Sequence, residues 1–441
     1  MSRRILGIIA LLVAFSLSPR QLVGSDADEA GQSTTTTVGA PALPAVEEGV
    51  SPSSYGRTPG LLVPYRGVGE PYRQMYQEAP AYRGPGRDEP DPDDLKSVRI
   101  GVLVPLEGGR AGQGKSVADG VRLAFEEANG RGGYSGLPFE AMVRDDLPTW
   151  GSSAGALVEM TYDDGLWALI GSTESNTTHI AARLALKINL PIVTVNSPDP
   201  TITEHAIPWI VRLSPDDRQT GYRLADLLFT RMGATRVAVI RSSNRYGRVG
   251  IKEFREASRR LGRPVPVEVQ YVPGSKDFSA QVQRVAAVGA DVVVMWADPD
   301  GGARIVRAIR EQGLTMPIVA TDRLVDPDFL AMAGDAAEGL IATHPLPVER
   351  AETGWRDFAQ TYKERFETEA DIYAAWGYDA GRAVVEAVLE AGLNRARIRD
   401  ALHDPDQRSG VAGPVEQDIT GNNPVRPVLV RVVGGRFVDM D

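Results

Sequence analysis

The chain has 441 residues, 42% of them apolar, which is enough for two or three domains with sizeable cores. Acidic residues outnumber basic ones 58 to 48, so no polyanion-binding surface is indicated and nucleic acid is not an expected partner. Cysteine is absent, which excludes disulfides, thiolate catalysis and a lipid anchor built on cysteine. The four histidines stand far apart in the sequence, so we expect no metal site and no cofactor.

The N-terminus has the pattern of an export signal. A short basic stretch, residues 1–4, precedes an apolar run over residues 5–17. This run is short for a membrane span, which takes about 20 apolar residues. We therefore interpret residues 1–25 as a signal peptide cut after Ser25 or as an uncleaved signal anchor. Both alternatives export everything downstream, and only the second leaves the chain attached to a membrane.

Residues 26–97 are predicted to form a disordered linker. The stretch "GQSTTTTVGAPALPAVEEGVSPSS" is rich in Thr, Ser, Pro and Gly, and the stretch that follows adds Tyr, Arg and more prolines. Neither has a sustained period of 2 or 3.6, so neither is expected to bury a core.

A first alternation of strands and helices begins at Val98. "VRIGVLVP" is typical of a buried strand, and residues 117–128 place apolar side chains on one helical face. The strands "FEAMV", "LWALI" and "PIVTV" follow, with a helix before each of the last two, the second predicted over 177–188. Strands alternating with helices of this length indicate right-handed βαβ units and a parallel sheet.

The same alternation restarts at residue 235. The strands "TRVAVI", "VEVQYV", "DVVVMW" and "MPIVAT" alternate with helices predicted over 248–261, 277–287 and 301–312. We interpret this as two similar doubly wound lobes. A single large Rossmann enzyme is the rival, but "GGRAGQG" after the first strand has the wrong spacing for the dinucleotide fingerprint. Two helical segments follow, and the C-terminal stretch predicts a β-hairpin that turns at Gly434-Gly435.

A row of polar residues follows the third strand. Residues 172–178 hold six hydroxyl or amide side chains in seven positions, where the strand ends and a helix begins. Ligands bind beyond the carboxyl ends of parallel strands, and helix N-termini attract anions. One such residue would suffice as an N-cap, so we favour a site for a carboxylate or another polar acceptor. Glu174 would repel an anion if its side chain pointed inward.

Other strand ends are equally polar. Because such ends meet at one edge of each sheet, two lobes are expected to form a cleft between them, a common place for small-molecule sites. No nucleophile and base, catalytic cysteine or metal cluster accompanies them, which argues against an enzyme. The strand-end positions are Asn196 and Ser197 in the first series, and the stretch 242–246 with Tyr246, Asp298, and Thr321 with Asp322 in the second.

Residues 98 to about 440 resemble the branched-chain amino-acid-binding family of ABC-transporter solute-binding proteins, the type I periplasmic binding proteins. The resemblance rests on the order and coverage of several pieces, among them "LIGSTESNTT", "LPIVTVNSPDP", "VAVIRSSNRYG" and "YAAWGYDAGRAVVEAV". It implies an α/β fold of two Rossmann-like lobes with parallel sheets, joined by three crossovers and closing on a ligand. It also implies delivery to the permease of an ABC importer, without catalysis.

The resemblance also implies site residues. Ser175 matches a hydroxyl that holds the ligand carboxylate, and Asn196 and Ser197 occupy the loop that binds the same head group. Tyr246 matches an aromatic wall of the second lobe. Asp322 matches the acid that receives the ligand ammonium. Two further positions are assigned to the pocket: Gln113, where some members have an aromatic residue, and Asp298 at a strand end of the second lobe.

We therefore expect an extracytoplasmic receptor, periplasmic or at the cell surface, for a small polar ligand such as an amino acid or a related amide or carboxylate. The alternatives are a tethered sensory or scaffold module and, less favoured, a Rossmann-type enzyme. The expected division of the chain is residues 98–213 and 345–410 in the first lobe, and residues 214–344 and 411–441 in the second.

Overall fold

The computed structural model describes residues 80–146, 150–205, 207–263, 265, 267–404, 408–415, 417, 418 and 420–440. These residues belong to one compact unit of the chain. The predicted signal segment 1–25, and the predicted linker up to residue 79, lie outside them. Within the described part, no helix combines the length and the apolar character that a membrane span needs.

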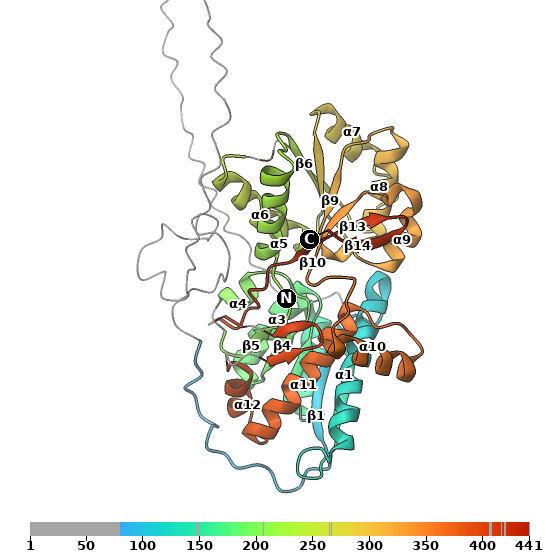
Figure 1. Cartoon of the computed structure of the whole chain (residues 1–441). Coiled ribbons are helices and arrows are strands. Elements are labelled where there is room, and N and C mark those ends of the chain that lie inside the picture. The colour runs from blue at the N-terminus through green and yellow to red at the C-terminus, as the bar shows by residue number, and fades with distance from the viewer. Residues whose placement is uncertain are drawn as a thin grey trace, which may run out of the picture. The chain divides into compact units, whose positions relative to one another are not determined.

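Lobe I is built on a parallel sheet with the strand order β2-β1-β3-β4-β5 (Figure 1). Its inner strands are short runs of mostly aliphatic residues that are almost wholly buried, as expected for parallel strands covered on both faces. The strands are β1 (Val98–Val104), β2 (Phe139–Asp145), β3 (Ala168–Gly171), β4 (Ile192–Thr194) and β5 (Ile210–Arg212).

Two long helices of lobe I, α1 (Ala111–Gly130) and α11 (Ile372–Ala391), pack closely because glycines stand at their contact. A Cβ atom on Gly120 would lie 2.1 Å from the carbonyl oxygen of Ala374, and one on Gly377 would lie 2.2 Å from that of Val117. The second helical segment of the chain therefore returns to lobe I. The other elements of this part are η3 (Gly108–Arg110), α2 (Trp150–Tyr162), α3 (Ser175–Ile188), α4 (Thr201–Glu204), α10 (Thr353–Phe366), α12 (Arg395–Leu402) and the ribbon β11 (Arg408–Gly410) with β12 (Gly413–Val415).

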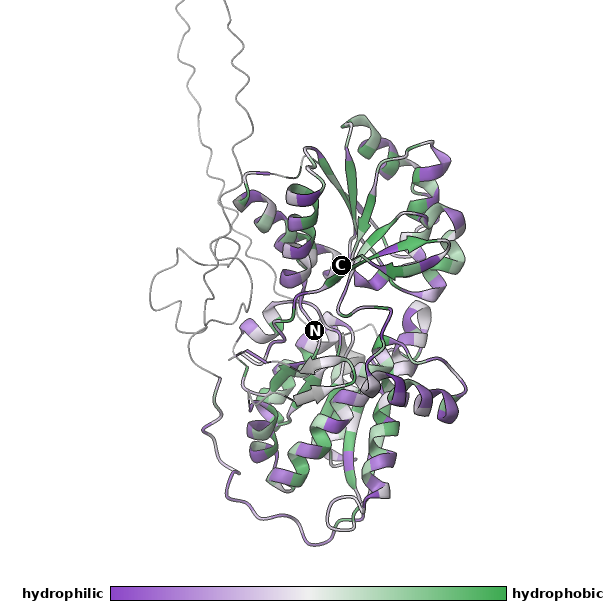
Figure 2. Ribbon diagram, in the orientation of Figure 1, coloured by the Kyte–Doolittle hydropathy of each residue, from purple (hydrophilic) through white to green (hydrophobic). Residues whose placement is uncertain are grey.

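Lobe II holds a larger sheet with the strand order β14-β13-β10-β9-β8-β6-β7, parallel except for its C-terminal hairpin. Figure 2 shows apolar strands within this lobe and hydrophilic residues on the helices around them. The strands are β6 (Val237–Ser242), β7 (Val267–Tyr271), β8 (Val292–Trp296), β9 (Ile318–Ala320), β10 (Ile341–His344), β13 (Val428–Val433) and β14 (Arg436–Asp439). The helices and turns are α5 (Asp217–Ala225), η4 (Asp226–Arg231), α6 (Arg245–Arg260), α7 (Ser279–Ala287), α8 (Pro299–Glu311), η5 (Asp322–Leu324), α9 (Pro327–Ala333) and η6 (Gly334–Ala337).

The predicted α/β fold with two parallel-sheet lobes is confirmed, and so is the hairpin at Gly434-Gly435. Three helices begin two or three residues earlier than predicted, at Ser175, Arg245 and Pro299. Their first turns carry polar residues or proline, which give no apolar periodicity. These early starts matter because Ser175 is thereby the first residue of its helix rather than part of the loop before it.

The sequence-based division of the chain between the lobes stays a proposal. Around its last boundary, the backbone N–H groups of Val411 and Ala412 donate to Asp379 of α11 in lobe I. Farther on, the backbone N–H of Arg212 in β5 donates to the carbonyl oxygen of Gly421. We propose that the third crossover lies close after this point, before β13 begins.

The described end of the predicted linker, residues 80–97, is not a free chain and departs from the expectation. This segment, called the strap below, lies along lobe I (Figure 1). The ring of Tyr82 packs on Trp209, with centroids 4.6 Å apart. The side-chain amide of Asn394, which also caps α12, donates to the carbonyl oxygens of residues 86, 87 and 89. Its prolines lack N–H groups, so a strap can dock through carbonyls and side chains without a helical or strand period.

We expect removal of the strap to destabilise the protein. A chain that starts at Asp94 loses the contacts of Tyr82 and leaves the Asn394 amide without three acceptors. Its free energy of unfolding should fall by about 1–3 kcal/mol relative to a chain that starts at Pro80. Urea unfolding of the two chains measures the difference. Equal midpoints would show that the strap contributes no net stability.

Candidate ligand-binding site between the lobes

The carboxyl ends of the strands in both lobes meet at a small cavity of about 10 Å³. A cavity of this size holds a single water-sized group, so the two lobes are closed around little free space. Entry of a ligand would require the lobes to separate. The cavity is lined by Asn196, Pro198, Pro215, Thr220, Asp322, Thr343, His344, Pro345, Trp376 and Pro427.

The polar row after β3 is largely used to build the loop. The carbonyl oxygen of Ser172 accepts hydrogen bonds from the hydroxyls of Thr194 at 3.0 Å and Ser197 at 2.7 Å. The hydroxyl of Ser172 donates to Asp146 and accepts from the backbone N–H of Glu174. These contacts tie the loop to the next strand end.

Ser175 is the first residue of α3 and is 2% exposed. Its hydroxyl accepts a 3.4 Å hydrogen bond from the backbone N–H of Asp199. The preceding residue, Glu174, makes no side-chain cap, so the first N–H groups of the helix stay available to an acceptor. Ser175, at the start of α3, thus contacts the loop after β4 that holds Asn196 and Ser197.

Asn196 and Asp322 come from opposite lobes and face the same cavity. The side-chain nitrogen of Asn196 is buried and has no hydrogen-bond partner among the described residues. Burial raises the pKa of Asp322, and the nearby positive charge of Arg323 opposes this effect. A polar donor and an acid therefore face each other across a closed space.

Tyr246 and Asp298 both contact Arg323, a residue that was not predicted from the sequence. Its guanidinium lies 3.6 Å from the centroid of the Tyr246 ring and donates to Asp298 at 2.7 Å. The hydroxyl of Tyr246 is hydrogen-bonded to Thr321. Burial raises the pKa of Tyr246 well above its usual range, so the phenol is neutral.

Gln113 lies on α1 and joins the lobes. Its side-chain oxygen accepts from Arg110 at 2.8 Å, and its nitrogen donates to Asp326 of lobe II at 3.1 Å. Arg110 also forms an ion pair with Glu174. The positive charge of Arg110 therefore offsets the repulsion that Glu174 would exert on an anionic ligand. Arg110 of lobe I and Asp298 of lobe II line a groove of about 680 Å³.

A second contact between the lobes involves Arg245 at the start of α6. Its guanidinium donates to Asp199 of lobe I at 2.6 Å and reaches His179 at 2.9 Å. Hydrogen bonds from His179 and Thr201, with the nearby cations, lower the pKa of Asp199 against the opposing effect of burial. Such polar and charged contacts between the lobes help to hold the closed arrangement.

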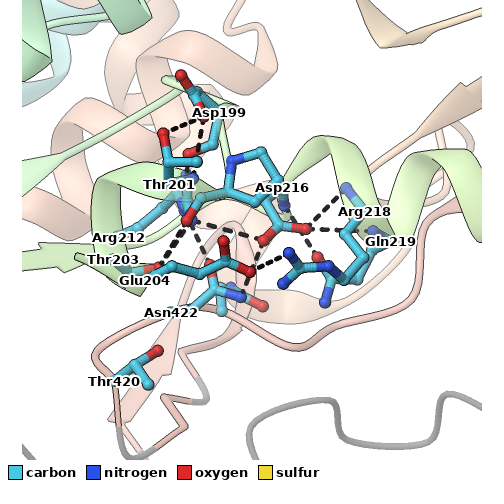
Figure 3. A network of polar contacts seen from close by, with 12 residues as sticks. Asp199, Thr201, Thr203, Glu204, Arg212, Asp216, Arg218, Gln219, Thr420 and Asn422 are labelled. Carbon is cyan, nitrogen blue, oxygen red and sulfur yellow. Dashed lines mark hydrogen bonds and ion pairs between the residues drawn. The ribbon is translucent and has the colours of Figure 1, made fainter. Parts of the chain in front are cut away.

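A buried polar network lies where the chain passes from β5 to α5 (Figure 3). Arg212 is fully buried and donates to the carbonyl oxygens of Ser197 and Asp199, both at 2.7 Å. It also donates to Asn422 at 2.8 Å and lies 3.6 Å from Asp216, the N-cap of α5. The network thereby connects the ligand loop to two of the segments that link the lobes.

Four residues of this region were not predicted from the sequence: Arg110, Arg323, Asp217 and Trp376. Arg323 directly follows the predicted Asp322, so the strand-end rule could have found it, whereas Arg110 lies beyond the end of β1, in the turn η3, and carries no such signal. Asp217 is 2% exposed and accepts from the indole of Trp296, and burial raises its pKa well above its usual range. Among the described residues no group of three or more acidic or histidine side chains is placed to hold a metal ion.

Comparisons with known proteins agree with the two-lobed fold. A Brucella abortus Leu/Ile/Val-binding protein homolog is 25% identical over 331 residues, which cover 74% of this chain and 87% of that protein. The structure of a leucine binding protein from Thermotoga maritima matches with a TM-score of 0.71 at 25% identity, covering 78% of this chain and 98% of that one. A solute binding protein from R. palustris, solved with benzoate, matches with a TM-score of 0.69 at 19% identity, covering 78% and 95%.

The model of the periplasmic binding protein family matches residues 97–436, which contain both lobes and the cavity between them. This range is most of the chain, and it includes each strand of the two large sheets except for the end of the C-terminal hairpin. The chain therefore belongs to the periplasmic binding protein family, whose members bind ligands and are not enzymes.

Proposed function

We propose that this protein is an extracytoplasmic receptor that closes its lobes on an amino acid and delivers it to the permease of an ABC importer. The observation that carries the proposal is the pair Asn196 and Asp322, which face one cavity from opposite lobes. A zwitterion has an acceptor for the first residue and a cation for the second. Each lobe alone offers only half of these contacts, so closure would depend on the ligand.

The relatives support an amino acid as the ligand class. The Brucella protein is named for leucine, isoleucine and valine, and the Thermotoga protein for leucine. Export is supported by the family and by the basic and apolar pattern of residues 1–25. A tethered sensor that uses the same cleft would bind the same ligand but would not contact a permease.

The second candidate is a carboxylic acid without an ammonium group. Burial raises the pKa of Asp322, which reduces the charge that such a ligand would leave unpaired. The R. palustris structure with benzoate shows that this fold accepts an aromatic acid. A thermal-shift screen of the mature chain against amino acids, amides and aromatic carboxylic acids separates the candidates. A shift with aromatic acids and none with any amino acid would contradict our proposal.

Ser175→Ala should weaken binding of the best screened amino acid about tenfold to a hundredfold, because a hydrogen bond to a charged group contributes about 1.5–3 kcal/mol. Folding should change little, since among the described residues the hydroxyl accepts a single long hydrogen bond, from the backbone N–H of Asp199. Calorimetric titration measures the affinity. Ser275→Ala, in an exposed turn of lobe II, is the matched control. Unaltered affinity would mean that Ser175 serves the loop alone.

A further inference from the structure

Two arginines, the buried Arg323 and the largely buried Arg110, approach one carboxylate from opposite lobes. Arg110 ends the turn η3 in lobe I, and Arg323 lies in the turn η5 of lobe II. One oxygen of Glu174 forms an ion pair with Arg110 and lies 3.6 Å from a terminal nitrogen of Arg323. The positive charge of Arg323 also contributes to a lowered pKa of Arg110, after the larger effect of burial, so the two guanidinium groups are close enough to repel each other.

Both arginines have donor nitrogens without a hydrogen-bond partner in the part of the chain that the structure describes. Arg323 is 1% exposed, yet its Nε and Nη2 have no hydrogen-bond partner among the described residues, and neither does Nη2 of Arg110. A guanidinium has five N–H donors and cannot accept. Buried donors without partners are rare and costly, so each needs an explanation.

The hydrogen bonds that the pair makes do not use these donors, although Nη2 of Arg323 is the nitrogen that lies within ion-pair distance of Glu174. Arg323 uses Nη1 for Asp298 and stacks on Tyr246, while Arg110 uses Nε for Gln113 and Nη1 for the carbonyl oxygen of Thr173 at 3.3 Å. The unpaired guanidinium N–H groups require acceptor oxygens. A planar carboxylate supplies two, in a geometry that matches the paired donors of an arginine.

The arginine pair lies within reach of the head-group cavity. Arg323 directly follows Asp322, and consecutive Cα atoms are only about 3.8 Å apart. The charges of Arg110, Asp322 and Arg323 all influence the pKa of the buried Tyr373, after the larger effect of burial, so the three groups lie in one region of the molecule. A small ligand could thus place one end beside Asp322 and the other between the arginines.

We propose that the ligand carries a second carboxylate, held between Arg110 and Arg323, in addition to its head group at Asn196 and Asp322. The ligand class is then a dicarboxylic amino acid of about the size of glutamate. This inference rests on the proposed function, of which it narrows the ligand. In the closed protein without ligand, Glu174 occupies the place of the second carboxylate, and the ligand takes over its arginine partners.

The first test compares ligands on the unaltered chain by calorimetric titration with glutamate, glutamine and leucine. Glutamate should bind more tightly than glutamine by about tenfold to a hundredfold, because its extra charge engages the unmet donors. Equal or tighter binding of glutamine or leucine would overturn the second-carboxylate site while leaving an amino-acid receptor. Failure of all amino acids in this titration and in the thermal-shift screen would instead contradict the proposed function.

The second test uses variants. Arg110→Gln and Arg323→Gln should each abolish the preference for glutamate over glutamine, and this ratio of two affinities is the readout because loss of Arg323 also alters the surroundings of Asp322. Arg307→Gln is the control, since this side chain is 58% exposed on α8. Glu174→Gln should act in the opposite direction and tighten glutamate several-fold, because it removes the competing carboxylate. A preference that survives in both arginine variants, or a loss of glutamate affinity in Glu174→Gln, would contradict the placement.

Discussion

Arg212→Met should lower the free energy of unfolding by about 3–5 kcal/mol, the usual cost of removing one partner of a buried charge pair. The variant leaves the carbonyl oxygens of Ser197 and Asp199 without a donor and the buried carboxylate of Asp216 without its cation. Methionine fills a similar volume, so the loss reports mainly on the polar network of Figure 3. Urea unfolding at neutral pH measures it.

Two further variants make this result specific. Arg307→Met, on the exposed face of α8, should change stability by no more than about 0.5 kcal/mol. Adding Asp216→Asn to Arg212→Met should recover part of the loss, because asparagine caps a helix as well as aspartate does and carries no buried charge. A loss below about 1 kcal/mol in the single variant would show that the network is not a structural centre.

Asp322→Asn should weaken binding of an α-amino acid at least tenfold and leave the fold intact. Breaking a buried charge contact at a binding site costs about 2–5 kcal/mol. Because burial raises the pKa of Asp322, affinity should also fall as the pH drops through this raised pKa and the acid loses its charge. The variant should lack this pH dependence.

The measurement is calorimetric titration of both proteins with the best amino acid and with its deaminated analogue. Asp335→Asn, on the exposed surface of lobe II, is the matched control and should bind like the unaltered chain. The unaltered protein should bind the analogue weakly. If it binds the analogue as tightly as the amino acid, Asp322 is not the ammonium acceptor and the ligand is a simple acid.

The periodicity of the chain predicted both lobes because parallel strands buried on two faces are continuous apolar runs, of which "VVVMW" in β8 is an example. The same pattern predicted that the polar loops lie close together, since the carboxyl ends of parallel strands lie at one edge of a sheet. It could not predict that Arg323 turns back over Tyr246, because that depends on side-chain packing between residues distant in sequence. Nor could it predict the strap, since proline-rich docking leaves no period to detect.

The strap also determines which lobe a protein domain fused to this end of the chain would move with. Its contacts with Trp209 and Asn394 fasten it to lobe I, and its last residue leads directly into β1 of the same lobe. A fluorescent protein fused ahead of Pro80 would therefore travel with lobe I as the cleft opens. Its distance to a dye on lobe II would change with ligand, while its distance to a dye on lobe I would not, which makes this end of the chain a natural place for an optical biosensor.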